Sequence, residues 1–395
     1  MHTTPYIILL FIGYLIFTID KKKEDLPVPP ILTLIGISLF FIPYFSSIEI
    51  TENLIYHIFL PGLLFTSAYR FPPSALKENG GIIGFFATIG LVLTVILLGS
   101  IIFIISTPFV SMSFAGAILI AAMLTPTDPV SVASILKQSS GDEMMADVVE
   151  GESLINDGTS IVIFSVVSGI FLNKEPFSFS FFLGEFLLVS LGGIFIGILF
   201  GWLFSKAIHF THHKEYQVML SIVVAYGIFN LAEFLDLSGV LATVFAGIML
   251  SFEFGRTIKE DHFRESLDNF WGIVEISILS LLFLLIGIVS ADHLSFNYWW
   301  LAVLIFIASI IVRFIIIAGT TQVFPKWRKK IGWRKSFLLS WSGLKGTMSV
   351  FLILSLSTQG GDRTDLLLSL TFAAVLLSLI IQSIGIYPLS KRLLK

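Results

Sequence analysis

The stretch EGESLINDG, residues 150–158, opens a long apolar run that continues through IVIF at 161–164. Its acids Glu152 and Asp157 therefore begin a segment that otherwise has the composition of a membrane span. An ionisable side chain is costly there and marks a functional site by default. Upstream, TPTDP at 125–129 places two prolines and an acid inside another apolar run. These two stretches predict the functional centre of the chain.

The composition places the chain among polytopic membrane proteins. Of its 395 residues, 55% are hydrophobic and 13% are charged, and the mean hydropathy is +0.93. A soluble domain carries about a quarter charged residues. The apolar stretches are near the ~20 residues of a spanning helix, which excludes an outer-membrane barrel. The chain has no cysteine, so disulfides, thiolate metal sites and thiol catalysis are excluded. We expect no nucleic-acid partner, because the basic residues lie in short loops and form no surface stripe. We also expect no cofactor.

The hydropathy pattern predicts an all-α protein with thirteen transmembrane spans. We place them near 5–19, 28–48, 53–70, 80–107, 111–137, 150–172, 179–206, 216–236, 237–254, 269–290, 297–323, 336–358 and 365–390. Of the 24 basic residues, 20 then lie in odd-numbered loops and the C-terminal tail, and two, Lys174 and Arg363, in even-numbered loops. The remaining two lie within spans. Because positive charge stays cytoplasmic, we expect a multi-pass cell-membrane protein with its N-terminus outside and its C-terminus in the cytoplasm.

The order of the spans suggests a single transporter domain over residues 1–395 with inverted repeats. No loop is long enough for a soluble regulatory domain. The fifth span holds TPTDP, and the twelfth holds SGLKGT at 342–347, which is again polar and broken by glycine. An offset of seven spans makes the two run in opposite directions. Interrupted segments at corresponding positions are the best sequence indication of a transporter's binding site.

The prolines of TPTDP predict an unwound helix. Pro126 and Pro129 each remove a backbone donor and obstruct the preceding turn. Thr127 and Asp128 then offer oxygen atoms at the break, which suit a hard cation or balance the dipoles of the helix ends. A simple proline kink capped by Asp128 is the alternative.

Helical spacing separates the polar residues of EGESLINDG. Positions four apart share a face, so Ser153 lies beside Asp157 and Glu152 lies beside Asn156. The first pair is a candidate cation site and the second a structural pair. Glu150 fits a cytoplasmic helix start, whereas Asp157 lies about 10 Å deeper at 1.5 Å per residue.

Two basic residues lie inside predicted spans. Arg313 sits in the apolar run 307–318 and needs a buried partner. Glu152 is the leading candidate, because a pair satisfies both ions where either alone would be strongly destabilising. Lys345 in the second broken span neutralises Asp128 or the helix ends there, or else extends toward water.

These residues resemble those of a known family. The chain is similar to the NhaP and sodium/proton-exchanger type of monovalent cation:proton antiporter, in the branch marked by an Asn-Asp pair. The matching words are LPGLLF at 60–65, TPTDPV at 125–130, EGESLINDG at 150–158, SGVLA at 238–242 and SWSGLKG at 340–346, together with Arg313. The resemblance covers essentially the whole chain. One difference is Thr66, which stands where many bacterial members carry an acid.

The resemblance implies a role for each site residue. Asp157 would alternately bind a proton or a sodium ion, beside the neutral Asn156. Thr127 and Ser153 would help to ligate the cation. Asp128 and Lys345 would balance two crossed discontinuous helices, and Glu152 would pair with Arg313. The implied fold has a six-helix core bundle, about 80–172 and 297–390, and a dimerisation domain, and the implied assembly is a homodimer in membrane lipid.

The function we expect is therefore the exchange of sodium for protons. Cation and proton would compete for Asp157 under alternating access, one for one and without net charge, with lithium and potassium as further candidate cations. A monovalent cation channel built on the same unwound helices is the alternative. An intramembrane hydrolase with Asp128 and Asp157 as an acid dyad lacks the usual glycine-flanked aspartate motif, so we do not expect an enzyme.

Overall fold

Within the residues that the structure describes, every regular element is a helix. This computed structural model describes residues 4–23, 27–46, 48, 51–128, 132, 136, 142–173, 178–208, 213–254, 261–294, 297–360 and 364–393. The all-helical fold predicted from the sequence is confirmed. Among the described residues, eight helices are long and apolar enough to cross a membrane, and four more apolar helices are shorter. The number of thirteen spans stays a prediction.

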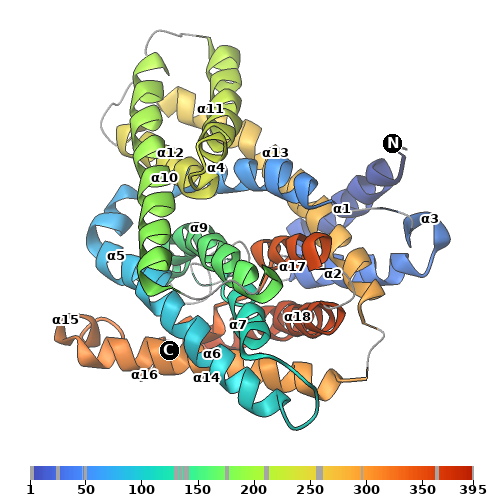
Figure 1. Ribbon diagram of the computed structural model, residues 1–395. Coiled ribbons are helices and arrows are strands. Elements are labelled where there is room, and N and C mark those ends of the chain that lie inside the picture. The colour runs from blue at the N-terminus through green and yellow to red at the C-terminus, as the bar shows by residue number, and fades with distance from the viewer. Residues whose placement is uncertain are drawn as a thin grey trace.

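The helices pack in two groups, which Figure 1 shows as a bundle around α7 and α9 and an arc along one side of it. The bundle contains α5 (Pro73–Phe85), η2 (Phe86–Gly90), α6 (Leu91–Ser106), α7 (Phe114–Met123), α9 (Glu143–Asn173), α14 (Trp299–Val323), α15 (Pro325–Arg328), α16 (Trp333–Trp341), α17 (Thr347–Gly360), α18 (Asp365–Leu377), η5 (Ser378–Gln382) and α19 (Ser383–Leu393). The arc contains α1 (Thr4–Lys23), α2 (Val28–Phe40), α3 (Pro43–Ser46), η1 (Leu54–Phe59), α4 (Leu60–Arg70), α10 (Phe179–Ile208), α11 (Lys214–Phe234), α12 (Gly239–Phe254) and α13 (Asp261–Asp292). The elements η1, η2 and η5 are π-helical turns.

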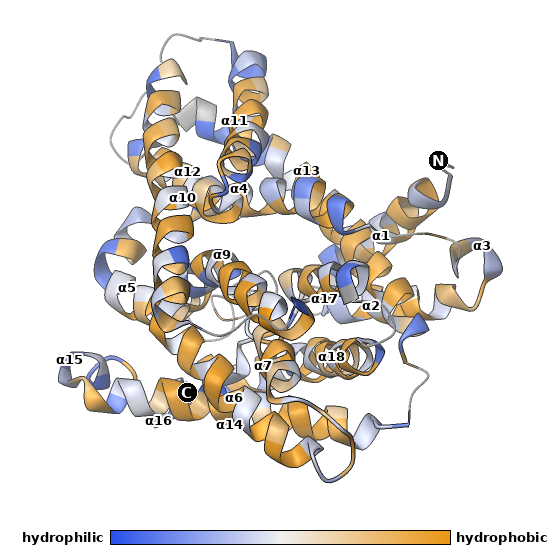
Figure 2. Ribbon diagram, viewed as in Figure 1, coloured by the Kyte–Doolittle hydropathy of each residue, from blue (hydrophilic) through white to orange (hydrophobic). Residues whose placement is uncertain are grey.

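Most helices of both groups consist largely of hydrophobic residues (Figure 2), many of which are exposed. Large side chains such as Leu188 and Phe195 on α10 are about two-thirds exposed, at 68% and 64%. In water such a surface would drive aggregation, whereas hydrocarbon chains solvate it. Helices suit this environment because each satisfies its own backbone hydrogen bonds. The molecule is therefore built as a multi-pass membrane protein.

One predicted boundary is wrong in a way that affects the site. Helix α9 begins at Glu143 and not near Glu150, because Asp142 caps it: Asp142 Oδ1 accepts a hydrogen bond of 3.2 Å from the Met145 backbone N–H. The other carboxylate oxygen of Asp142 lies 2.6 Å from Lys335 Nζ on α16. Glu150 therefore lies about two turns inside α9, and the helix start that we assigned to it belongs to Asp142.

Candidate functional site

The first broken helix ends just before the predicted cation ligands. Helix α7 stops at Met123, and the chain runs without helical structure from Pro126 to Asp128. Pro126 has no backbone donor, so the ladder of helical hydrogen bonds cannot continue through it. The side chain of Thr127 is buried and that of Asp128 is half-buried. Pro129, the second proline of the predicted break, lies outside the described residues.

The second broken helix is hydrogen-bonded to the first. Helix α16 ends at Trp341, and SGLKG at 342–346 joins it to α17. The backbone N–H of Asp128 donates a hydrogen bond of 2.8 Å to the carbonyl oxygen of Leu344, so the two breaks are joined directly. Asp128 Oδ2 also accepts a bond of 3.2 Å from Thr347 Oγ1 and a longer contact of 3.5 Å from the Thr347 backbone N–H. Asp128 of the first break thus caps the N-terminus of α17, where the helix dipole favours a negative charge.

Helix α9 lies against the first break through a serine and an amide. Ser153 Oγ donates a hydrogen bond to the carbonyl oxygen of Thr127, and Asn156 Nδ2 donates one of 2.8 Å to Thr127 Oγ1. All three side chains are at most 4% exposed. Residues three apart on a helix share a face, so one face of α9 holds both oxygen atoms of Thr127 in place.

Asp157 is the next residue of α9 and is left available for a ligand. Within the described part of the chain, Asp157 Oδ1 and Asn156 Oδ1 are buried and have no hydrogen-bond partner. Such atoms are rare in folded proteins because an unpaired buried polar group is costly. The carboxylates of Asp157 and Asp128 also lie within range of each other's charge. A proton or a hard cation would satisfy this oxygen-rich surrounding.

The supporting charges lie beside this centre. Arg313 Nη2 of α14 is 2.8 Å from Glu152 Oε2, the partner that the sequence analysis expects, and the two side chains are 12% and 4% exposed. Lys345 is 6% exposed, so the alternative in which it extends toward water is wrong. Lys345 lies near enough to Arg313 and Glu152 to be influenced by their charges. Its neutralisation of Asp128 or of the helix ends stays a prediction. The buried Thr66 hydroxyl donates to the carbonyl oxygen of Gly62 in its own helix.

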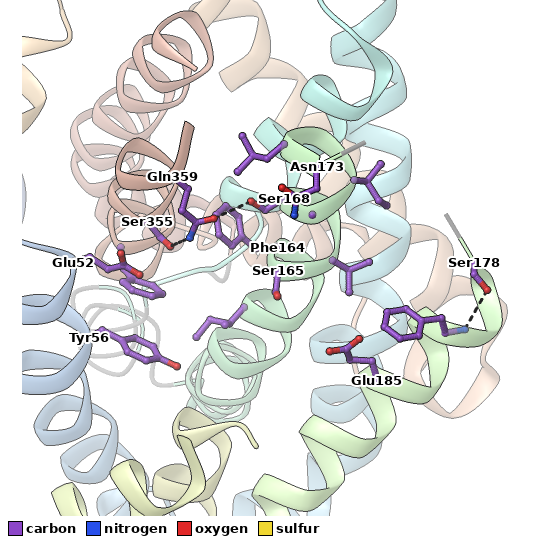
Figure 3. A pocket seen from close by; sticks show the side chains of 17 residues that line it. Glu52, Tyr56, Phe164, Ser165, Ser168, Asn173, Ser178, Glu185, Ser355 and Gln359 are labelled. Atoms are coloured by element: carbon purple, nitrogen blue, oxygen red, sulfur yellow. Dashed lines mark hydrogen bonds between the residues drawn. The ribbon is translucent and has the colours of Figure 1, made fainter. Parts of the chain in front are cut away.

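An open cavity of about 750 Å³ lies along α9, on the C-terminal side of Asp157 in the sequence (Figure 3). It lies between α9, α10, α17 and η1 and has Glu52 and Glu185 in its walls. Its lining reaches Ile161, one helical turn from Asp157, or about 6 Å. Beside it, Tyr56 of η1 stacks on Phe351 of α17 at a centroid distance of 4.4 Å. The cavity therefore comes within one helical turn of Asp157 along α9.

Sequence reasoning missed several residues that complete the site. Thr347 bonds Asp128, and Ser378 of η5 accepts a hydrogen bond of 2.9 Å from the Lys345 backbone N–H. Gln382 bonds Trp341 at the end of α16. The available signal was Gln382 itself, a buried amide inside the apolar run LLSLIIQSIGI at 376–386.

Gly346 offers a test of the crossing. A Cβ atom built on it would overlap Oδ2 and Cβ of Asp128, so only glycine lets the carboxylate approach α17. We expect Gly346→Ala to lower the stability by about 1–3 kcal/mol, the usual effect of overpacking. Thermal unfolding in detergent measures it. Gly319→Ala on α14 is the matched control, because nothing lies within 4 Å of its added Cβ. Equal melting temperatures for the two variants would contradict the close approach.

Comparison with known sequences assigns the chain to a family. The sequence model described as "Sodium/hydrogen exchanger, transmembrane" matches residues 7–392. The chain belongs to the sodium/hydrogen exchanger family. Within that family, it is 30% identical over 389 residues to the Na(+)/H(+) antiporter NhaG of Bacillus atrophaeus, covering 95% of this chain and 72% of the relative. It is 31% identical to the low-affinity Na(+)/H(+) antiporter NhaS1 of Synechocystis sp., covering 96% and 72%.

The fold of this exchanger-family chain also matches a solved structure. The sodium proton antiporter MjNhaP1 from Methanocaldococcus jannaschii superposes with a TM-score of 0.80 over 100% of both chains, at 20% sequence identity. This likeness confirms the predicted all-helical fold of a multi-pass membrane protein. The resemblance noted from the sequence motifs is confirmed by the family match.

Proposed function

We propose that this chain exchanges sodium ions for protons across the cell membrane, with Asp157 as the residue that binds them in turn. One observation carries the proposal: a carboxylate oxygen of Asp157 is buried without a hydrogen-bond partner in the described structure, one turn from an open cavity. A purely structural acid at this depth would be paired, as Glu152 is with Arg313. The names of the relatives, which are Na(+)/H(+) antiporters, support the same reaction.

Competition for one carboxylate is sufficient to couple the two ions. Asp157 holds a proton or a cation but not both, and the core crosses the membrane readily only when this charge is neutralised. Each crossing then carries one positive charge, so a full cycle exchanges one sodium ion for one proton without net charge movement. No covalent bond is made or broken, so the chain acts as a transporter and not as an enzyme, and it needs no cofactor.

We propose that Asp157, Thr127 and Ser153 ligate the sodium ion, with Asn156 as their neutral neighbour. The Thr127 carbonyl accepts from Ser153 and keeps a second lone pair for a cation. The Ser153 hydroxyl, acting here as a donor, also keeps its lone pairs. Asn156, on the same face of α9, donates to Thr127 Oγ1. An oxygen-only shell of this kind suits sodium, lithium or potassium.

We assign the motion to the core bundle, about 80–172 and 297–390, relative to the arc of helices that would form the dimerisation domain. The packing into two groups supports this division. We further propose a homodimer in membrane lipid, with its N-terminus outside and its C-terminus in the cytoplasm, as the distribution of Lys and Arg favours. In this orientation the cavity beside Asp157 opens to the outside.

Membrane voltage separates this proposal from a cation channel. In proteoliposomes we expect sodium-driven proton flux to change little when a potential of about 100 mV is imposed, although that potential is worth about 2.3 kcal/mol per unit charge. A pH-sensitive dye measures the flux, with sodium, lithium and potassium added in turn. A sodium conductance without counter-transported protons would instead identify a channel.

A further inference from the structure

The last span of the bundle contains a polar turn that the exchange cycle does not use. Helix α18 passes into the π-helical turn η5 and then into α19. Ser378 and Gln382 lie at the two ends of η5 and are 0% and 2% exposed. Single π-helical turns inside α-helices are frequent at functional sites, because they re-aim side chains. An amide and a hydroxyl buried in a membrane span also need partners.

Three hydrogen bonds join this turn to the second break, and a fourth links the two side chains within the turn. Gln382 Nε2 donates to the carbonyl oxygen of Trp341 at 2.7 Å, and Trp341 Nε1 donates to the carbonyl oxygen of Gln382 at 3.1 Å. Ser378 Oγ donates to Gln382 Oε1 and accepts from the Lys345 backbone N–H at 2.9 Å. Gln382 and Ser378 therefore reach the last residue of α16 and the residue two before α17.

These are backbone groups that a broken helix leaves without helical partners. The last carbonyls of α16 and the first N–H groups before α17 cannot bond within their own helices. At membrane depth no lipid can satisfy them, so protein or water must. The side chains of η5 satisfy one group on each side of the break. They hold SGLKG at 342–346 in one conformation.

The second break is also hydrogen-bonded to Asp128. The Leu344 carbonyl accepts from the Asp128 N–H, and Thr347 Oγ1 donates to the Asp128 carboxylate. Asp128 is bonded covalently to Thr127, whose two oxygen atoms face Ser153 and Asn156. A continuous set of bonds thus runs from Gln382 through the second break to the proposed sodium ligands.

A parallel with α9 supports this role. Helix α9 follows the first break by one span and bonds it with a serine and an amide, Ser153 and Asn156. Helix α18–η5–α19 follows the second break by one span and again bonds it with a serine and an amide, Ser378 and Gln382. Only α9 adds a carboxylate beside the pair, Asp157. We call Ser378 and Gln382 the clamp of the second break. These two side chains can hold the break through hydrogen bonds, but neither carries a charge that could neutralise a cation.

We propose that Gln382 and Ser378 are positioning residues for transport, which hold the second break so that Leu344 and Thr347 fix Asp128 and with it Thr127. The inference rests on the proposed sodium/proton exchange. It predicts that loss of the clamp weakens cation binding without removing the residue that carries the ion.

Three variants test the clamp. Gln382→Met keeps the length of the side chain and removes its donor and acceptor, and we expect the half-saturating sodium concentration to rise about tenfold, equivalent to about 1.4 kcal/mol. Ser378→Ala should raise it in the same direction, and Ser378→Thr, which keeps the hydroxyl, should restore it. Ser383→Ala is the matched control on the same helix, because the buried Ser383 hydroxyl has no partner among the described residues. It should leave sodium affinity unchanged.

Hydrogen exchange of the backbone supplies a readout that does not depend on transport. Ser378→Ala should expose the amides of 342–347 to faster exchange, and Ser383→Ala should not. If the two residues are merely structural, Gln382→Met should lower only the melting temperature and the maximum transport rate. Its half-saturating sodium concentration and the hydrogen exchange of the 342–347 amides would then stay unchanged, and this result would overturn the inference. Absence of sodium-driven proton flux in the unmodified protein would instead refute the proposed function. Backbone hydrogen exchange would still show whether Ser378 and Gln382 hold the second break.

Discussion

Asp157→Asn is expected to abolish sodium-driven proton flux and to leave the protein folded. Asparagine has nearly the same shape as aspartate, but its amide does not bind and release a proton near neutral pH and carries no charge to neutralise a cation. Folding should persist because, in the described structure, Asp157 Oδ1 makes no hydrogen bond that the substitution would remove. Proton flux in proteoliposomes should fall to that of protein-free vesicles, while thermal unfolding and size-exclusion chromatography match the unmodified protein.

A second acid provides the control for this experiment. Asp365 lies exposed in the first turn of α18, where it only favours the helix dipole. Asp365→Asn makes the same chemical change and should keep normal exchange. A folded Asp157→Asn protein that still couples sodium to protons would refute the assignment of Asp157.

The second large effect is expected on stability. Arg313→Ala should cost about 3–5 kcal/mol, because it leaves the Glu152 carboxylate buried without its cation. Glu152 is 3% exposed and its Oε2 lies 2.8 Å from Arg313 Nη2. The guanidinium also packs closely against Gly343, because a Cβ added there would lie 2.5 Å from Arg313 Nε. The melting temperature in detergent and the yield of monodisperse protein measure the loss.

Removing both charges distinguishes the loss of the ion pair from the effect of leaving one ion buried and unpaired. In Glu152→Met/Arg313→Met no unpaired ion remains, so most of the stability should return, as it does when buried pairs are replaced by apolar groups of similar volume. If Arg313→Ala instead folds as stably as the unmodified protein and shows a grossly changed sodium affinity, the pair has no architectural role and Arg313 acts on the ion.

The local features of the site follow from sequence alone. Pro126 removes a backbone donor wherever it stands, so the first break is predictable from its position in an apolar run. The shared face of Ser153 and Asp157 follows from helical spacing. Arg313 in an apolar run demands an acid, and Glu152 was its leading candidate partner. In each case one residue type and its neighbours decide the outcome.

The contacts between distant segments do not follow from sequence. Asp128 could cap its own helix or another, and only the fold selects Thr347, 219 residues away. The start of α9 was misplaced because the cap, Asp142, precedes a polar stretch that does not resemble a membrane span. Gln382 was overlooked because a single amide hardly changes the mean hydropathy of an apolar run. Its partner, the Trp341 carbonyl, is a backbone atom that no side-chain pattern reveals.

The hydrogen bond from Asp128 N–H to the Leu344 carbonyl has a consequence for ion preference. It joins the two breaks into one piece, so the oxygen atoms around Asp157 keep their mutual spacing wherever the bundle stands in the membrane. The cation shell is then not rebuilt at each crossing. We therefore expect the order of preference among sodium, lithium and potassium to be the same when measured from either side of the membrane, even where the rates in the two directions differ.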